Sequence, residues 1–76
     1  MRDLVSTLVA GLVRDPGSVR VYERHVHGRL VIELSVDPED RGRVIGRQGR
    51  TANALRTLLA AVAGKSERSC SLEILD

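Results

Sequence analysis

The chain has 76 residues, 42% of them hydrophobic, with Tyr22 as its only aromatic residue and a net charge of +2. That length permits one small domain, residues 1–76, and leaves little room for the deep cavity of an enzyme. A single cysteine, Cys70, excludes an internal disulfide and points to the reducing cytoplasm. The apolar N-terminal stretch is broken by Ser6 and Thr7, so we expect neither a signal peptide nor a membrane span.

An amphipathic helix is predicted at the start of the chain. Leucine and valine recur at every fourth position over residues 4–13 and form an apolar stripe, so we expect a helix from Asp3, its N-cap, to Arg14. The run Asp15-Pro16-Gly17 then stops this helix, because proline cannot continue it and glycine favours a turn.

A β-hairpin is predicted next. β-Favouring residues predict a strand over about 18–26, and the apolar residues at every second position from Leu30 to Val36 predict a second strand over about 29–36. His27-Gly28 is the expected turn between them.

Two more helices and a last strand complete the prediction. Asp37-Pro38-Glu39-Asp40 predicts a helix start with Asp37 as N-cap, and this short helix runs to Ile45. We expect a third helix over 50–63, closed by Gly64, and a strand from about Cys70. The predicted fold class is therefore α+β in the order α-β-β-α-(GxxG)-α-β, with a mixed three-stranded sheet and the helices on one face.

Positive charge is concentrated in the second half of the chain. Residues 41–66 contain six of the twelve basic residues and none of the ten acidic ones, so this segment carries +6 and the rest −4. All but one of the basic residues are arginine, whose planar fork suits phosphate. The same charge run also fits a solvated helix face, so charge alone leaves nucleic-acid binding open.

A glycine loop lies at the centre of this basic segment. In Gly46-Arg47-Gln48-Gly49, each glycine permits a positive φ and a close approach of backbone to a ligand. The third helix begins there, so its free N–H groups and the Arg47 fork would meet a phosphate lying across Gly46 to Arg50. A GxxG run also fits a plain interhelical turn, but the basic context favours phosphate binding.

The sequence V-I-G-R-Q-G-R over residues 44–50 resembles the V-I-G-x-x-G segment of KH domains. The order of elements looks like the type II KH arrangement, and over nearly its whole length the chain is similar to the KhpA family of bacterial single-KH-domain proteins. The resemblance implies binding of single-stranded RNA, because a KH loop clamps the backbone of about four nucleotides. It also implies a role in post-transcriptional regulation and in cell shape.

Residue by residue, the resemblance implies an RNA site made of Gly46 and Gly49 as close-approach positions, Arg47 and Gln48 facing phosphate, and Arg50 and Arg43 as further cations. Ile45, Leu34 and Val36 are candidates for the apolar floor under the bases, although plain core packing is the alternative for all three. Arg47 replaces the lysine usual in the family, which keeps the charge. The last strand is poorer in basic residues than the family's usual strand. With no aromatic residue near the loop, we expect low sequence selectivity.

Other candidate sites have weaker support. His25 and His27 share a strand face, but no further ligands complete a metal site, so we expect exposed turn residues. Cys70 is expected to be a small core residue. No Walker lysine follows the glycine loop. We therefore expect no cofactor, no metal and no enzymatic activity.

The rival hypothesis is a protein-protein interaction module that dimerises and has little affinity for RNA. The third helix is rich in alanine, which permits close helix packing, and a smooth patch at Ala60, Ala61 and Ala63, with Leu59 at its edge, is the first candidate surface. The resemblance implies pairing with a second copy or with a larger, KhpB-like KH protein, and no membrane partner. The two hypotheses can hold together.

Overall fold

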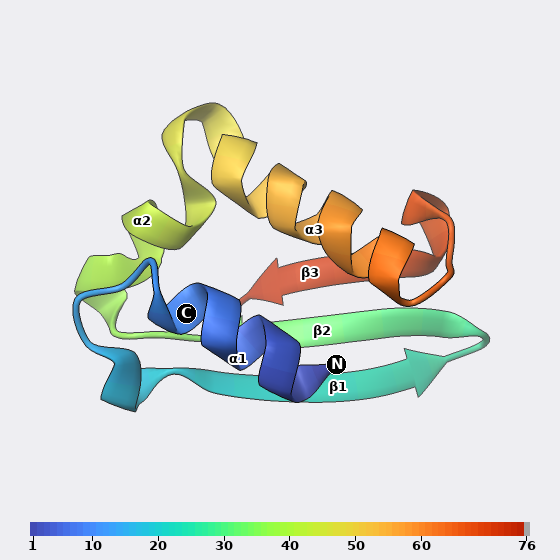
Figure 1. The fold of residues 1–76 in the computed structure, drawn as a ribbon, viewed down its shortest axis with the longest axis horizontal. Coiled ribbons are helices and arrows are strands. Elements are labelled where there is room, and N and C mark those ends of the chain that lie inside the picture. The colour runs from blue at the N-terminus through green and yellow to red at the C-terminus, as the bar shows by residue number, and fades with distance from the viewer. Residues whose placement is uncertain (76) are drawn as a thin grey trace.

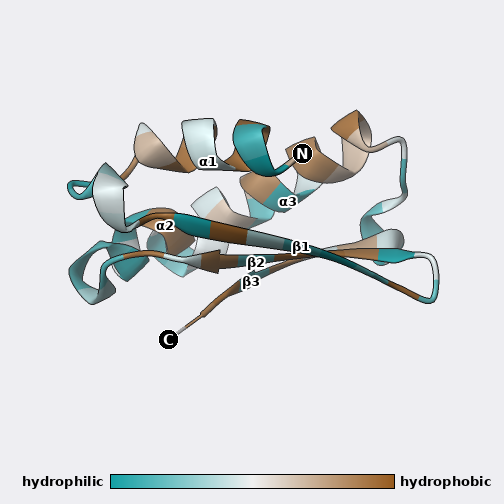
Figure 2. Ribbon diagram, turned by 90° about the horizontal axis from the view of Figure 1, so that it is seen from below, coloured by the Kyte–Doolittle hydropathy of each residue, from teal (hydrophilic) through white to brown (hydrophobic). Residues whose placement is uncertain are grey.

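Three strands form one mixed sheet, and the helices lie on one of its faces (Figures 1 and 2). The computed structural model describes residues 1–75. Its main elements are α1 (Arg2–Ala10), β1 (Arg20–Val26), β2 (Arg29–Ser35), α2 (Arg41–Ile45), α3 (Arg50–Val62) and β3 (Cys70–Ile74). Strand β2 is central, antiparallel to β1 and parallel to β3. This confirms the predicted α+β class, order and mixed sheet.

The core lies between the inner face of β2 and the helices. Leu30, Ile32 and Leu34 alternate along β2 and belong to the buried core cluster; of the residues between them, Glu33 is half-buried, whereas Val31 is buried outside that cluster. Each helix contributes valine or leucine to the same cluster: Val5 and Val9 from α1, Val44 from α2, and Leu55 and Leu59 from α3. Burying one such side chain contributes about 1.5–3 kcal/mol, so the sheet and helices stabilise one another.

The first helix is shorter than the sequence predicts. It ends at Ala10, where the N–H of Gly11 donates to the carbonyl of Leu8 at 3.3 Å and the N–H of Leu12 donates to that of Val9 at 2.9 Å. The predicted N-cap, Asp3, is also wrong: Met1 occupies that position and Asp3 lies in the first turn. Of the two apolar residues of the predicted stripe that lie beyond α1, Val13 still packs against the core, whereas Leu12 is exposed.

The other boundaries differ by a few residues. Pro16–Ser18 forms a 3-10 turn, so β1 begins at Arg20 and not at 18. Asp37 caps as predicted by accepting from the N–H of Glu39 at 2.9 Å, but the first turn is a 3-10 helix and α2 proper begins at Arg41. In α3, Leu55 and Leu59 face the core, whereas Ala54, Leu58 and Val62 are exposed. Within residues 1–75, no helix combines the length and hydropathy required to cross a membrane.

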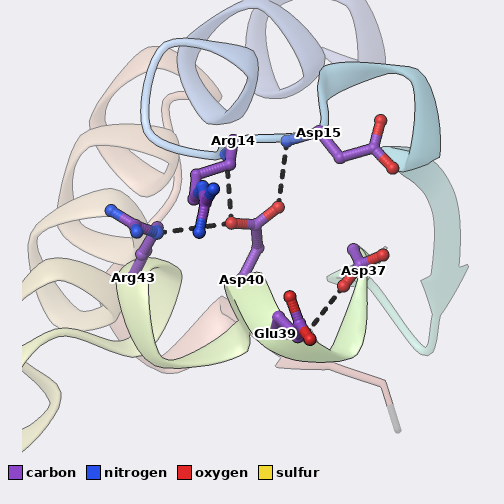
Figure 3. A network of polar contacts seen from close by, with 6 residues as sticks. All are labelled: Arg14, Asp15, Asp37, Glu39, Asp40 and Arg43. Atoms are coloured by element: carbon purple, nitrogen blue, oxygen red, sulfur yellow. Dashed lines mark hydrogen bonds and ion pairs between the residues drawn. The ribbon is translucent and has the colours of Figure 1, made fainter.

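A buried carboxylate, that of Asp40, links the segment after α1 to the start of α2. Asp40, 2% exposed, accepts hydrogen bonds from the backbone N–H groups of Arg14 at 3.0 Å and Asp15 at 3.1 Å (Figure 3). Its third partner is the Arg43 guanidinium at 3.4 Å. The hydrogen bond from Arg14 is the main cause that holds the pKa of Asp40 below its usual value of 3.8; burial opposes it, and the Asp15 N–H and the Arg43 charge support it.

We expect Asp40→Asn to lower the urea midpoint at pH 7, because an amide oxygen replaces only one of the two acceptors. A lowered folded-state pKa means that the stabilisation is present above the unfolded pKa and is lost as pH falls through the folded pKa. The variant should therefore lose less stability than the parent between about pH 5 and about pH 2. Urea titrations across that range check this, with the exposed Glu39→Gln as control; an unchanged acid dependence in Asp40→Asn would contradict it.

Candidate nucleic-acid interface

The glycine loop connects the end of α2 to the start of α3 at a corner of the molecule (Figure 1). Arg47–Gly49 forms one 3-10 turn after its N-cap Gly46, and Gly46, Gln48 and Gly49 all have positive φ, at 76°, 57° and 75°. The N–H of Gly46 donates to the carbonyl of Gly42 at 2.9 Å, and the N–H of Gly49 donates to the carbonyl of Gly46 at 3.1 Å. These bonds hold the loop in one compact conformation.

The two glycines are required for different reasons. A Cβ at Gly46 would overlap the Oγ1 of Thr51 and lie 2.8 Å from its backbone nitrogen, so the loop packs directly on the first turn of α3. A Cβ at Gly49 would meet only the Nδ2 of Asn53, at 3.9 Å. At position 49, glycine is therefore needed only because the backbone is in the left-handed region. Thr51, which no sequence pattern singled out, is therefore the partner that sets the loop against α3.

The exposed side of the loop is positively charged. Arg47, Gln48 and Arg50 are exposed, and within residues 1–75 their side chains have no hydrogen bond or ion pair. Helix α3 starts at Arg50 with no side-chain cap from its N-cap Gly49, and the N–H of Arg50 donates to the carbonyl of Arg47. A helix start of this kind carries partial positive charge. The unpaired cations thus lie at the positive end of a helix, an arrangement suited to phosphate.

Arg43 and Ile45 lie beside the loop in α2, as predicted. Arg43 is exposed, but its Nε is held 3.4 Å from Asp40, so its charge is partly balanced. Ile45 is 37% exposed and offers an apolar surface next to the glycines. Both residues are available to a ligand that contacts the loop.

The other two floor candidates are wrong. Leu34 is 0% and Val36 7% exposed, and both belong to the core cluster. Leu34 lies on the inner face of β2, with Val21 of β1 and Ile74 of β3 as its neighbours in the sheet. The core alternative holds for both residues, so Ile45 is the remaining floor candidate.

The histidines and the cysteine have the exposure that the sequence predicts. His25 and His27 are both exposed, but His25 belongs to β1 and only His27, with a φ of 51°, lies in the hairpin turn. Within residues 1–75 no group of three or more potential ligands could hold a metal ion. Cys70 is buried, and burial raises the pKa of its thiol. It is a core residue in this structure.

We expect Gly46→Ala and Gly49→Ala to differ in stability. The positive φ alone should cost about 1–2 kcal/mol at Gly49. At Gly46 the contact with Thr51 adds overpacking, for a total of at least about 2–3 kcal/mol. Chemical denaturation of both variants measures the difference; equal losses would contradict the close contact at Gly46, and a Gly46→Ala/Thr51→Ala double variant should recover part of its loss.

Comparison with known proteins identifies the family. Residues 2–74 match the family model described as KhpA/KhpB, KH domain. The chain is 48% identical over 75 residues to the RNA-binding protein KhpA of Caldanaerobacter subterraneus subsp. tengcongensis, covering 99% of this chain and 100% of the relative. It is 49% identical over 76 residues to that of Halalkalibacterium halodurans, covering all of both chains, and 43% identical over 68 residues to that of Streptomyces coelicolor, covering 90% and 86%. This chain belongs to the KhpA/KhpB family of KH domains.

Proposed function

We propose that the chain binds single-stranded RNA through Gly46–Arg50 and acts as a single domain over residues 1–76. The observation that carries this proposal is the exposed, unpaired pair Arg47 and Arg50 at the uncapped start of α3. Relatives named RNA-binding protein KhpA support it. Phosphate oxygens would accept hydrogen bonds from the arginine forks and from backbone N–H groups at the helix start.

Contacts with the bases are few in this arrangement. Ile45 is the apolar side chain beside the loop, and Tyr22, the only aromatic residue, lies in β1. Stacking on an aromatic ring, worth about 1–3 kcal/mol per base, is therefore missing at the loop. Binding is weak, salt-dependent and of low sequence selectivity, because phosphates carry no sequence information.

We expect the double substitution Arg47→Asp/Gln48→Asp to weaken RNA binding by roughly tenfold or more, because it places negative charge beside the phosphates. The fold should persist, since both side chains are exposed and aspartate tolerates the positive φ at 48. Fluorescence anisotropy with an oligouridylate measures affinity, and circular dichroism confirms folding. Arg2→Asp/Thr7→Asp, at exposed positions of α1, makes the same change in charge as a control. Equal RNA affinity in the two double variants would contradict the proposal.

A second candidate function is association with another KH protein, and an apolar groove favours it. The groove, about 220 Å³, lies between α1 and α3 and is lined by Leu8, Leu12, Thr51, Ala54, Leu55 and Leu58. Leu58 is 44% exposed, and Val62, one turn further on, is 55% exposed. The alanine patch expected from sequence is only partly right: Ala61 is exposed, but Ala60 and Leu59 are buried. We propose that this groove contacts a second copy or a KhpB-like protein.

We expect Leu58→Glu to abolish that association while the monomer stays folded, because the charge would be buried in the contact. Asn53→Glu, on another side of α3, is the matched control and should leave association unchanged. Sedimentation of the chain alone measures self-association, and sedimentation of its mixture with a KhpB-like protein measures association with that partner. The association proposal would be refuted if the chain sedimented as a monomer at all concentrations and did not bind the KhpB-like protein.

The cellular setting is proposed on the family alone. A cytoplasmic, non-enzymatic protein that acts in post-transcriptional regulation, with effects on cell shape and RNA chaperone activity, fits the RNA-binding relatives. No cofactor enters this proposal.

A further inference from the structure

Strand β1 is an outer strand of the sheet, and within residues 1–75 its only neighbouring strand is β2. All seven residues of β1 pair with β2 in continuous register, without a bulge. The half of β1 nearest the hairpin extends beyond α1 (Figure 1), and residues 22–26 are all exposed. The free edge of such a strand offers unpaired backbone donors and acceptors to a further strand.

The backbone groups of Glu23 and His25 lie on this free edge. Residues of an antiparallel pair alternate between hydrogen-bonded and non-hydrogen-bonded positions. The two-residue turn at 27–28, in which both residues have positive φ, closes on Val26 and Arg29, so these two form a hydrogen-bonded pair. Every second residue back from Val26 therefore bonds to β2, and the N–H and C=O groups of Glu23 and His25 point away from it.

The two arginines of β1 do not guard the edge. Charged side chains commonly protect an outer strand from pairing with another chain. Here Arg20 donates from one Nη to the carbonyls of Gly17 and Val19, both at 2.9 Å. The Nε of Arg24 donates to a carboxylate oxygen of Glu33, also at 2.9 Å. Both charges are thus directed at groups of the same chain, and β1 contains no proline or glycine.

The remaining side chains of β1 form two pairs, each centred on residue 24. On the face away from the helices, Tyr22 is 51% and Val26 39% exposed. Glu23 and His25 lie on the other face and are exposed, and within residues 1–75 neither has a hydrogen bond or ion pair. The first pair is apolar, and the second consists of a carboxylate and an imidazole. A two-fold axis at residue 24 would bring the members of both pairs together.

We infer that β1 pairs antiparallel with β1 of a second copy of this chain, about a two-fold axis at Arg24. Tyr22 then lies opposite Val26 of the second copy, and Glu23 lies opposite its His25. Pairs of these kinds stabilise antiparallel strands, and a carboxylate accepts a hydrogen bond from an imidazole N–H. The pairing joins two three-stranded sheets into one and satisfies the free backbone groups of both edges.

The neighbouring registers are poorer. An axis at Glu23 places this carboxylate directly opposite its own copy, and like charges in that position are destabilising. An axis at Tyr22 leaves Val26 beyond the end of the opposing strand. With the axis at Arg24, the two guanidinium groups also face each other, but each is already paired with Glu33 of its own chain. The strand is thus complementary to itself in one register.

Amide hydrogen exchange of the unsubstituted protein tests the pairing. The N–H groups of Glu23 and His25 have no acceptor in the single chain and donate to the second copy in the pair. Where about nine in ten chains are paired, we expect both amides to exchange about tenfold more slowly than in dilute solution, because exchange requires the unpaired chain. The amide of Asp3, in the first turn of α1, is the control and should not change with concentration.

Disulfide trapping tests the register. The Cα atoms of opposite residues at a non-hydrogen-bonded pair lie about 4.5 Å apart, within the range of about 4.4–6.8 Å that a disulfide spans. Arg24→Cys should therefore cross-link two copies under mild oxidation. Tyr22→Cys, exposed on the same face, is the matched control and should not cross-link to its copy, because the two lie about 14 Å apart along the strands. The native Cys70 is buried and does not compete.

Charge exchange at the seam tests the Glu23 and His25 contact. In the Arg24→Cys protein, Glu23→Lys places an ammonium opposite His25, and His25→Glu places two carboxylates opposite each other. Each should reduce cross-linking roughly threefold or more. In an equal mixture of these two variants, the mixed disulfide should exceed its random share, because the new lysine then faces the new glutamate. Mass spectrometry distinguishes the mixed from the symmetric products.

Three results would overturn this pairing. They are rapid exchange of both edge amides at every concentration, equal cross-linking of Arg24→Cys and Tyr22→Cys, and protection of the amides only after a KhpB-like protein is added, which would place a partner's strand on β1. Leu58→Glu should leave the pairing intact, because β1 contributes no residue to the groove between α1 and α3. The pairing is also independent of the proposed RNA binding, since the glycine loop takes no part in it.

Discussion

The buried carboxylate of Asp40 is the contact on which the arrangement of the helices depends. It accepts hydrogen bonds from two backbone N–H groups in the segment after α1 and forms an ion pair with Arg43 in α2. One side chain thus links the N-terminal segment to the helix that leads into the glycine loop. A buried charge is costly unless it is hydrogen-bonded, and here both oxygens have partners. The position of α2 is thereby fixed, and with it the direction from which the chain enters Gly46.

The close approach of Gly46 to Thr51 completes that constraint at the other end of α2. A five-residue helix contributes little stability by itself, so its place is set by contacts at both ends. With Asp40 before it and Thr51 after it, α2 presents the loop at a fixed angle to α3. Pre-organisation of this kind matters for a weak phosphate site, because ordering a loose loop on binding would cost part of the small gain in free energy.

Helix α3 presents a different chemistry on each of its sides. Leu55 and Leu59 pack on the sheet, Leu58 borders an apolar groove shared with α1, and Arg50 is exposed at the start of the helix beside the glycine loop. Because Leu58 lies about two turns beyond Arg50, a protein partner at Leu58 and an RNA strand at the loop need not compete. The RNA-binding and association proposals are therefore compatible.

The sequence by itself determined the order of the elements and the place of the loop. Local signals sufficed there: the alternation in β2, the Asp37-Pro38 start, and the glycines at 46 and 49 act through neighbouring residues. Only the tertiary structure decided which apolar side chains are buried, because that depends on what packs against each face. Leu34 and Val36 proved to be core while Ile45 is exposed, and Ala60 is buried while Leu58 is not. For the same reason, no local pattern marked the role of Asp40, since it depends on contacts with Arg14 and Asp15, 26 and 25 positions away.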